Sequence, residues 1–363
     1  MEVSFPVVAN FEVTYHQYLN ENSEVTHPFP SYMTPDVLRF LYKEMVLVRT
    51  FDTKAINLQR TGKMGTYPSI LGQEAVSVAI GHAMLKEDVI APYYRDQGLQ
   101  LQRGITMVDI FRYWGGDERG SDFRHSREDF PICVPIATQC LHAAGIAKAF
   151  QYRKQPRVAV TTIGDGGTSK GDFYEALNLA GTWNLPLVFI VNNNQWAISV
   201  HRSNQTGTLT IAQKAIAGGF AGVQVDGNDV VAVRQVVGDA LEKARHGHGP
   251  TLIEAITYRL GDHTTADDAN RYRSKEEVQS AWTKEPILRL RNYLMAHEFW
   301  DNEREEKLIA DCQAEVAQAV EDYIQTPRQT LGDIFDYTYE TLPPVLAEQK
   351  AYASRFKEKA HHD

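Results

Sequence analysis

Cysteine is scarce in this chain, and long apolar segments are absent from it. Three cysteines occur among 363 residues, Cys133, Cys140 and Cys312, and none is spaced as C-x-x-C. This pattern argues against a disulfide framework or a zinc site and is typical of reduced thiols in the cytoplasm. No run reaches the roughly 20 apolar residues of a membrane span, and the N-terminal stretch lacks the features of a secretory signal. We expect a cytoplasmic protein that does not cross a membrane.

Basic residues are also fewer than acidic residues. The chain has 37 Lys and Arg against 46 Asp and Glu, which gives a formal net charge of −9. Without a general basic field, nucleic acids and anionic membranes are disfavoured as partners. Internal repeats and low-complexity tracts are absent as well. What remains is a globular composition, 43% hydrophobic, that is long enough for a substantial core in one to three domains.

The most informative stretch is residues 157–200. Residues 158–163 are an apolar run typical of a buried strand, and the glycine-rich turn 164–167 breaks it and lets the backbone approach a ligand closely. Apolar residues at helical spacing follow between 173 and 183. A second apolar run, 187–191, ends in three asparagines. This pattern predicts two parallel strands joined by a crossover helix.

Both polar clusters of this stretch follow the carboxyl ends of predicted strands, where open α/β sheets bind ligands. Asp165, an asparagine amide and backbone carbonyls are hard oxygen ligands, which Mg²⁺ accepts when phosphates complete its shell. Two common phosphate loops are excluded. A Walker loop needs Ser or Thr after Lys170, where the chain has Gly171, and a dinucleotide fingerprint needs Gly where Ser169 stands.

An ordered set of motifs carries a family resemblance from about residue 35 to the C-terminal region. The sequence GDG is followed, after 25 residues, by a double Asn, and GDGGTSKGDFYEALNLAG spans 164–181. The chain resembles the alpha chain of the thiamine-diphosphate-dependent decarboxylating component of 2-oxo acid dehydrogenase complexes. The alternative is a structural βαβ unit with a glycine turn. The other matching motifs are GQEA (72–75), YYRDQG (93–98), PIATQ (135–139) and YRLGDHTTADDANRYRS (258–274).

The resemblance implies a role for individual residues. Asp165, Asn194 and the carbonyl of Trp196 match the magnesium ligands. Tyr94 and Arg95, with Arg259, match diphosphate contacts, for which the guanidinium fork is well suited. His263 matches an active-site histidine that can donate or accept a proton. The further positions matched to cofactor binding are Val134, Ile136, Gly164, Gly166, Gly167, Ala197 and Ile198.

The implied reaction is oxidative decarboxylation of a 2-oxo acid, with transfer of the acyl group to a lipoyl domain of an acyltransferase component. The resemblance also implies an α2β2 assembly in which a beta chain supplies an activating glutamate. Pyruvate is the favoured substrate because GDGGTSKGDFYE and VDGND look most like bacterial pyruvate dehydrogenase alpha chains. A branched-chain 2-oxo acid is the next candidate, although Asn192 departs from the animal branched-chain pattern. Acetoin dehydrogenase, a magnesium-dependent phosphotransferase and a noncatalytic regulatory module are further alternatives.

The whole pattern predicts an α/β fold, a mostly parallel sheet with helices on both faces. Thr34, Pro35 and Asp36 form a good helix start, and the helix should end near residue 60. We expect an extended arm over residues 1–33, a thiamine-diphosphate-binding domain over 34–275 and a helical region over 276–363. Further strands are predicted at 89–91, 223–225 and 251–256, and further helices at 138–152 and 230–245.

Several polar residues leave two interpretations open. Glu74 is either a functional acid near the cofactor or a capping or bridging residue. His125 either faces the active site or is a solvated loop residue. Arg49 and Asp52 are expected to be solvated or paired charges, and the acids Asp226 and Asp229 are expected to cap the helix that follows them.

Overall fold

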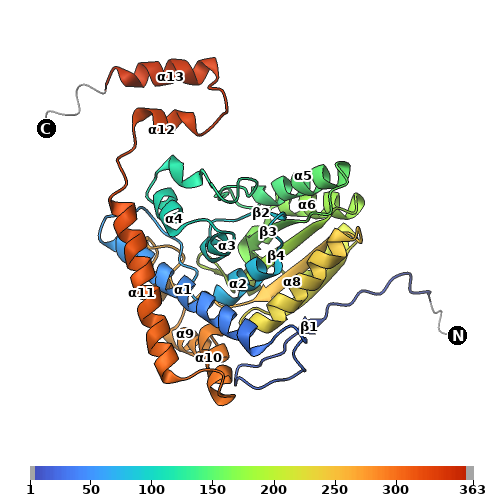
Figure 1. The fold of residues 1–363 in the computed structure, drawn as a ribbon. Helices are drawn as coiled ribbons and strands as arrows, with labels where there is room; N and C mark the ends of the chain where they lie inside the picture. Colours follow the sequence, from blue (N-terminus) through green and yellow to red (C-terminus); the bar gives the residue numbers. More distant parts are fainter. Residues whose placement is uncertain (1–4, 357–363) are drawn as a thin grey trace.

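A six-stranded parallel sheet forms the centre of the computed structural model, which describes residues 5–356 (Figure 1). The strand order is β1-β7-β8-β4-β3-β2, and every neighbouring pair in this sheet is parallel. The predicted α/β fold is therefore confirmed. The strands are β1 (Tyr15–His16), β2 (Val89–Ala91), β3 (Ala159–Gly164), β4 (Leu187–Asn193), β7 (Ala221–Asp226) and β8 (Thr251–Ile256), and a separate antiparallel pair is formed by β5 (Trp196–Ala197) and β6 (Val200–His201).

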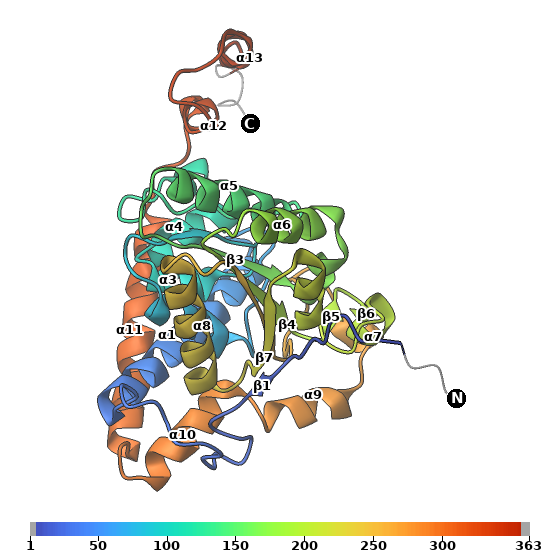
Figure 2. The ribbon, with the colours of Figure 1, turned by 90° about the vertical axis from the view of Figure 1, so that its right-hand side faces the viewer.

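Helices cover both faces of this sheet, because the strands are apolar on both faces. Along β4, Val188 and Ile190 join a core with helices α1, α2 and α8, while Phe189 and Val191 join a second core with α5 and α6. Such double burial is typical of parallel strands. Figure 2 shows α5 and α6 on one side of the strands and α1 and α8 on the other. The helices are α1 (Pro35–Arg60), α2 (Glu74–Ala83), α5 (Thr138–Tyr152), α6 (Gly171–Thr182) and α8 (Val230–Arg245).

The predicted strand-turn-helix-strand unit is confirmed by β3, α6 and β4. These strands are direct neighbours, and Gly164 at the end of β3 is in register with Asn192 near the end of β4. The glycine turn therefore lies beside the asparagine cluster at one edge of the sheet. A 3-10 turn, η2 (Asp165–Ser169), connects β3 to α6.

The predicted ends of α1 are also confirmed. Thr34 caps the helix, since its side chain accepts a hydrogen bond from the Val37 amide, and Pro35 occupies the first turn. After β8 the chain is helical, as expected, and α10 (Pro286–Ala296) and α11 (Asn302–Ile324) pack on α1. The remaining helices are α3 (Gln97–Gln102), α4 (Met107–Trp114), α7 (Arg202–Gln205), α9 (Lys275–Trp282), α12 (Leu331–Asp336) and α13 (Pro344–Ser354), with 3-10 turns η1 (Glu118–Ser121), η3 (Ala212–Gly218) and η4 (Ala269–Arg271).

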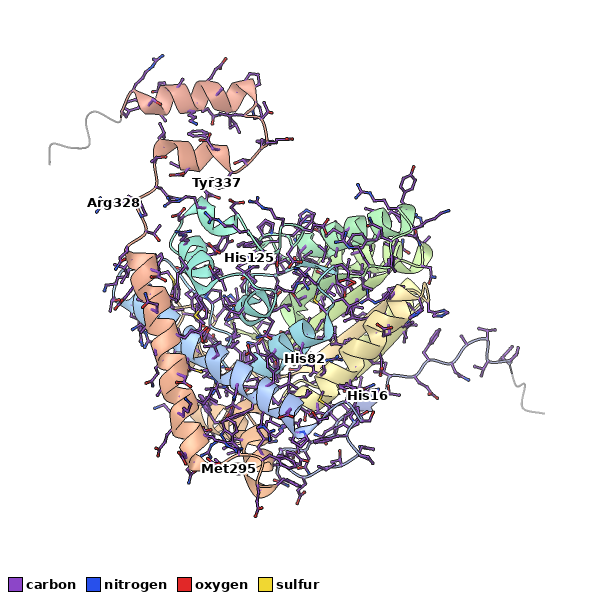
Figure 3. The ribbon with its side chains drawn as sticks, in the orientation of Figure 1. His16, His82, His125, Met295, Arg328 and Tyr337 are labelled. Atoms are coloured by element: carbon purple, nitrogen blue, oxygen red, sulfur yellow. The ribbon has the colours of Figure 1, made fainter. Side chains whose placement is uncertain are left out.

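The last two helices, α12 and α13, project from the body and contain no buried residue (Figure 1). Arg328 lies in the connection between α11 and α12 (Figure 3). A hydrogen bond from Gln329 Nε2 to Asp117 Oδ1, 3.0 Å long, ties this connection to the body.

The N-terminal segment is anchored from residue 14 onward. β1 pairs in parallel with β7 at the sheet edge. The backbone amides of Tyr18 and Leu19 donate hydrogen bonds of 2.6 and 2.7 Å to Asp229 Oδ2, while Asp229 Oδ1 caps α8. The capping role predicted for Asp229 is confirmed, and this buried side chain also holds the N-terminal segment. The same prediction is wrong for Asp226, which accepts a hydrogen bond from the Asn228 amide within the turn and pairs with Arg289.

The cysteines and the apolar character of the helices can both be read from the structure. Cys133, Cys140 and Cys312 are all free, and Cys140 and Cys312 are buried. Among residues 5–356, no helix combines the length and apolar character needed to cross a bilayer.

Candidate active site

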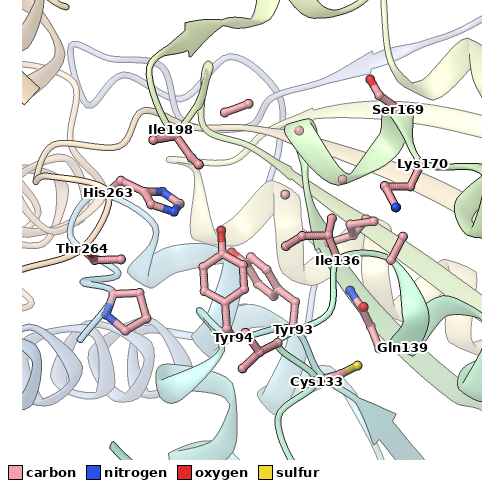
Figure 4. Close-up of a pocket in the computed structure, with 18 of the residues that line it drawn as sticks. Tyr93, Tyr94, Cys133, Ile136, Gln139, Ser169, Lys170, Ile198, His263 and Thr264 are labelled. Atoms are coloured by element: carbon pink, nitrogen blue, oxygen red, sulfur yellow. The ribbon is translucent and has the colours of Figure 1, made fainter. Parts of the chain in front are cut away.

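A largely apolar cavity of about 670 Å³ opens beside the carboxyl ends of β3 and β4. Figure 4 shows His263, Ile198 and Tyr94 on one side of it and Gln139 and Lys170 on the other. Its lining comes from segments far apart in the sequence. The lining residues are Thr66, Pro68, Tyr93, Tyr94, Trp114, Cys133, Val134, Ile136, Ala137, Gln139, Ile163, Gly164, Gly166, Gly167, Ser169, Lys170, Ala197, Ile198, His263 and Thr264.

The turn η2 brings backbone and one carboxylate to the end of the cavity. A Cβ atom at Gly166 would lie 2.7 Å from the Cβ of Ala197, so only glycine fits there. Asp165 is buried, and its Oδ2 has no hydrogen-bond partner. Burial raises the pKa of Asp165 to about 6. An unpaired buried carboxylate oxygen is costly, and a cation would satisfy it.

A buried lysine, Lys214, holds the turn η2 in place. Lys214 Nζ donates hydrogen bonds of 2.9 Å to both the carbonyl and the Oγ1 of Thr168. It also lies 5.3 Å from the ring centroid of Tyr174. These contacts fix the conformation of η2. No motif or spacing pointed to Lys214, because lysine is rarely buried.

Asn194 and Trp196 place further oxygen atoms near Asp165. Asn194 Oδ1 accepts a 3.2 Å hydrogen bond from the Trp196 amide, and Asn194 Nδ2 donates to Gln73 Oε1 at 3.2 Å. The Trp196 carbonyl accepts a 3.2 Å hydrogen bond from Arg259 Nη1. Within residues 5–356, no three His, Cys, Asp or Glu side chains are placed so that together they could hold a metal ion. A metal here would therefore rely on one carboxylate, neutral oxygens and the ligand's own phosphates.

Arg95 and Arg259 are both fully buried, and both approach His263. Arg95 donates to the carbonyls of Ser69 and His263, and Arg259 donates to those of Trp196 and Ile198. Within the described chain neither guanidinium forms an ion pair, and the Nε atom of each has no hydrogen-bond partner. Two buried positive charges without a carboxylate partner are a favourable environment for an anionic ligand.

His263 lies between these arginines and the cavity. Its Nδ1 is 3.2 Å from Arg95 Nη2 and 3.4 Å from Arg259 Nη1. Arginine can only donate, so Nδ1 is the acceptor and the proton resides on Nε2. Burial and the two arginines lower the pKa of His263 to about 3. The side chain is therefore a neutral hydrogen-bond donor at neutral pH.

The cavity rim contains strained backbone. Ala137, Gln195 and Ile198 have φ angles of 71°, 72° and 54°, in the left-handed region. This conformation is unfavourable for a β-branched residue such as Ile198. Strain of this kind persists only where surrounding contacts enforce it, and it concentrates at ligand sites.

Other polar residues singled out in the sequence are structural. Glu74 is fully buried, pairs with Arg49 and accepts a hydrogen bond from the Gly72 amide, which is the bridging role. Asp52 is paired rather than solvated, since it accepts hydrogen bonds from Tyr67, Ser69 and Ile70. Asn192 and Asn193 hold neighbouring strands together through Thr257 Oγ1 and Glu254 Oε1.

His125 does not reach the cavity. It is exposed and lines a separate, charged cavity with Arg103 and Asp129. Figure 3 labels its position. The interpretation that His125 faces the active site is therefore wrong. The solvated interpretation agrees with the structure, because the loop that carries His125 is held at the end of α3, where Ser126 Oγ donates a hydrogen bond to the Arg103 carbonyl.

The structure sorts the predicted site residues into two groups. One group lines the cavity directly: Tyr94, Val134, Ile136, Gly164, Gly166, Gly167, Ala197, Ile198 and His263. The other group is buried around its end: Arg95, Asp165, Asn194, Trp196 and Arg259. Sequence reasoning missed Tyr93 and Gln139 although both stand inside quoted motifs, and it missed Trp114, for which no motif existed.

Comparison with known proteins gives a consistent result. Residues 42–331 match the family described as "Dehydrogenase E1 component". The chain belongs to this family. It is 38% identical over 342 residues to the pyruvate dehydrogenase E1 component subunit alpha of Mycoplasma genitalium, covering 94% of this chain and 96% of the relative. It is 40% identical over 337 residues to the protein of that name in Bacillus subtilis (92% and 90%), and 43% identical over 315 residues to the 3-methyl-2-oxobutanoate dehydrogenase subunit alpha of Mycobacterium tuberculosis (87% and 86%).

Membership of the E1 component family confirms the resemblance inferred from the motifs. It implies an oxidoreductase component of a 2-oxo acid dehydrogenase complex, dependent on thiamine diphosphate and working with a beta partner. The residues of this site fit such a cofactor. The buried arginines, the carboxylate oxygen without a hydrogen-bond partner and the glycine turn suit a metal-bound diphosphate. The apolar cavity suits the two rings of thiamine.

Proposed function

We propose that this chain is the alpha subunit of a pyruvate dehydrogenase that oxidatively decarboxylates pyruvate and passes the acetyl group to a lipoyl domain of the acyltransferase component. One observation carries the proposal. Two buried arginines that form no ion pair, and an oxygen of Asp165 that accepts no hydrogen bond within the described chain, lie together beside one apolar cavity. Bound thiamine diphosphate would supply an electron sink for loss of carbon dioxide.

Each part of the site has a task in this proposal. Asp165, Asn194 and the Trp196 carbonyl would hold magnesium, with cofactor phosphates completing its shell. Arg95 and Arg259, with Tyr94, would bind the diphosphate. Backbone groups of Val134 and Ile136 would hold the aminopyrimidine ring. His263 would donate its Nε2 proton to a group in the cavity and accept a proton there once ligand charge offsets the arginines.

The composition of the cavity supports a two-chain enzyme. No Asp or Glu is among its described lining residues, which agrees with an activating carboxylate supplied by a beta chain. Val134, Ile136 and Ile198 line the cavity yet remain 52%, 42% and 55% exposed. Such apolar exposure at a cavity mouth suits a covering partner. We place these contacts in an α2β2 assembly in the cytoplasm, where the three free thiols would stay reduced.

The second candidate substrate is a branched-chain 2-oxo acid. The Mycobacterium tuberculosis relative carries that name and has the highest identity of the three compared, 43%. Part of the substrate pocket would come from the beta chain. A panel of pyruvate, 2-oxobutanoate and 3-methyl-2-oxobutanoate on the assembled enzyme decides between the two candidates through their kcat/KM ratios.

Two measurements test the proposal. Calorimetry should show magnesium-dependent binding of thiamine diphosphate and no comparable binding of ATP. Decarboxylation with an artificial electron acceptor should require both the alpha chain and a beta chain from the same source. ATP binding in place of the cofactor, or full turnover by the alpha chain alone, would overturn it.

A further inference from the structure

One carboxylate on α9 contacts both segments that carry proposed ligand groups. Glu277 Oε1 accepts a 3.1 Å hydrogen bond from Trp196 Nε1 and a 2.8 Å hydrogen bond from the Tyr258 hydroxyl. Trp196 lies just after β4, and Tyr258 lies just after β8, which is the neighbouring parallel strand. Figure 2 shows α9 near β5, the short strand that contains Trp196. Glu277 therefore joins two loops at the carboxyl edge of the sheet.

These contacts close a ring around the candidate ligand groups. The Trp196 carbonyl accepts a 3.2 Å hydrogen bond from Arg259 Nη1. Arg259 follows Tyr258 directly in the chain, and the Tyr258 hydroxyl returns to Glu277. The ring thus passes from Glu277 through Trp196, Arg259 and Tyr258 back to Glu277. Polar networks of this kind hold their members in one arrangement, because moving any member breaks the contacts of its neighbours.

The start of α9 places Glu277 at this point. Ser274 caps the helix by accepting a hydrogen bond from the Glu277 amide, and α9 itself contains no buried residue. Glu277 is half-buried, whereas the adjacent Glu276 is exposed. Trp196 is buried, and its indole N–H can only donate. Loss of the Glu277 carboxylate would leave that buried donor without its partner, which is costly.

We propose that Glu277 is a positioning residue of the cofactor site, which holds the Trp196 carbonyl and the Arg259 guanidinium in a fixed arrangement. This inference rests on the proposed function, in which that carbonyl binds magnesium and that arginine binds the diphosphate. Glu277 acts through Trp196 and Tyr258 and touches neither ligand itself. Groups that orient a metal ligand in this way typically change metal affinity roughly 10- to 100-fold when they are removed.

Two adjacent glutamates provide a matched test. Calorimetry on the assembled alpha and beta chains measures the Kd of thiamine diphosphate at several magnesium concentrations. Glu277→Ala should weaken magnesium-dependent binding by roughly tenfold or more. Glu277→Gln keeps an oxygen that can accept both hydrogen bonds, so its Kd should stay within about threefold of the unmodified value. Glu276→Ala removes an exposed charge from the same helical turn and should change the Kd by less than about threefold.

Two further measurements separate positioning from a general loss of structure. Tyr258→Phe removes one donor of the ring and should weaken binding by about fivefold. Added to Glu277→Ala, it should weaken binding no further, because both changes break the same ring. With Mn²⁺ in place of magnesium, the electron paramagnetic resonance spectrum of the bound ion should change in Glu277→Ala and stay unchanged in Glu276→Ala, since only the former moves a metal ligand.

The outcomes distinguish this inference from the proposed function. If the unmodified assembly binds the cofactor with magnesium and Glu277→Ala binds it equally well, the positioning role is overturned while the cofactor site stands. Equal losses in Glu277→Gln and Glu277→Ala would also overturn it, because a retained acceptor would then have no effect. Should Glu277→Ala fail to assemble, unchanged affinity in Tyr258→Phe overturns the role. If the unmodified assembly binds no thiamine diphosphate, the proposed function itself is overturned.

Discussion

At the scale of single residues, two buried aspartates illustrate how partners decide the cost of a charge. Burial raises the pKa of both Asp52 and Asp165 to about 6. Asp52 accepts three hydrogen bonds, whereas one oxygen of Asp165 accepts none. The Asp52 carboxylate thus holds α1 to the segment 67–70. The Asp165 carboxylate keeps one oxygen free to bind a ligand.

Substituting each aspartate by alanine should therefore give opposite phenotypes. Asp52→Ala leaves three buried donors unpaired and should lower the free energy of unfolding by about 2–4 kcal/mol. Asp165→Ala removes a poorly paired charge, so the cofactor-free chain should change by less than about 1 kcal/mol, yet lose magnesium-dependent cofactor binding. Urea unfolding and calorimetry of both variants check this. A loss of stability at Asp165 as large as at Asp52 would contradict the ligand role.

His263 should make stability depend on pH. Its pKa falls from 6.5 in the unfolded chain to about 3 in the folded one, so the unfolded state takes up a proton first as the pH drops. The contribution of the neutral imidazole is complete above pH 6.5 and is lost as the pH falls toward about 3, by up to about 1.4 kcal/mol per pH unit.

Urea unfolding between pH 7.5 and 5 measures this effect, with His263→Gln as the control that keeps a neutral polar side chain. The unmodified chain should lose more stability than the variant over this range. Inorganic pyrophosphate, by offsetting the charges of Arg95 and Arg259, should raise the pKa of His263 in an NMR titration. Equal pH dependence of the two proteins would show that His263 titrates normally.

Whether the sequence predicted a site residue depends on how far apart in the chain that residue and its contacts lie. Asp165, Asn194 and the glycine turn stand next to the strands that position them, so local pattern and motif order were sufficient. Lys214 and Gln73 contact the site only through chain folding, from 46 and 121 residues away in sequence. Ile198 adopts its left-handed backbone because of its surroundings, which no local propensity encodes.

At the scale of elements, close packing of helices depends on which glycines face a neighbour. A Cβ atom added to Gly181 of α6 would collide with the carbonyl of Gly218 in η3, whereas one added to Gly145 of α5 would meet nothing within 4 Å. The apolar spacing of Phe173, Leu177 and Ala180 predicted α6 itself. It could not predict this approach, because the partner lies 37 residues further along the chain.

Replacing each of these two glycines by alanine should separate the effect of helix propensity on stability from the effect of close packing. Gly145→Ala should stabilise the isolated chain by up to about 1 kcal/mol, because alanine favours the helix. Gly181→Ala should destabilise it by about 1–3 kcal/mol through overpacking against backbone. Thermal melting of the isolated alpha chain measures both changes. Stabilisation by Gly181→Ala would mean that α6 and η3 can move apart without cost.

At the scale of the whole molecule, the sequence predicted the body better than the ends. The body encloses its own apolar surface, so hydrophobic period and capping residues determine its elements. The ends do not: the arm 5–13 is exposed, and α12 and α13 bury no residue. Because these ends bury little apolar surface in this chain, the hydrophobic pattern constrains their positions only weakly.

The strand order also has a consequence for how the chain is made. Tyr15 in β1 pairs with Gln224 in β7, which is 209 residues later (224 minus 15). At roughly 5–20 residues per second, a ribosome needs roughly 10–40 s to cover that interval. The first strand to emerge is therefore among the last to be paired. Throughout that time the N-terminal segment has no strand to pair with, and the edge of the nascent sheet is completed only after β7 has been made.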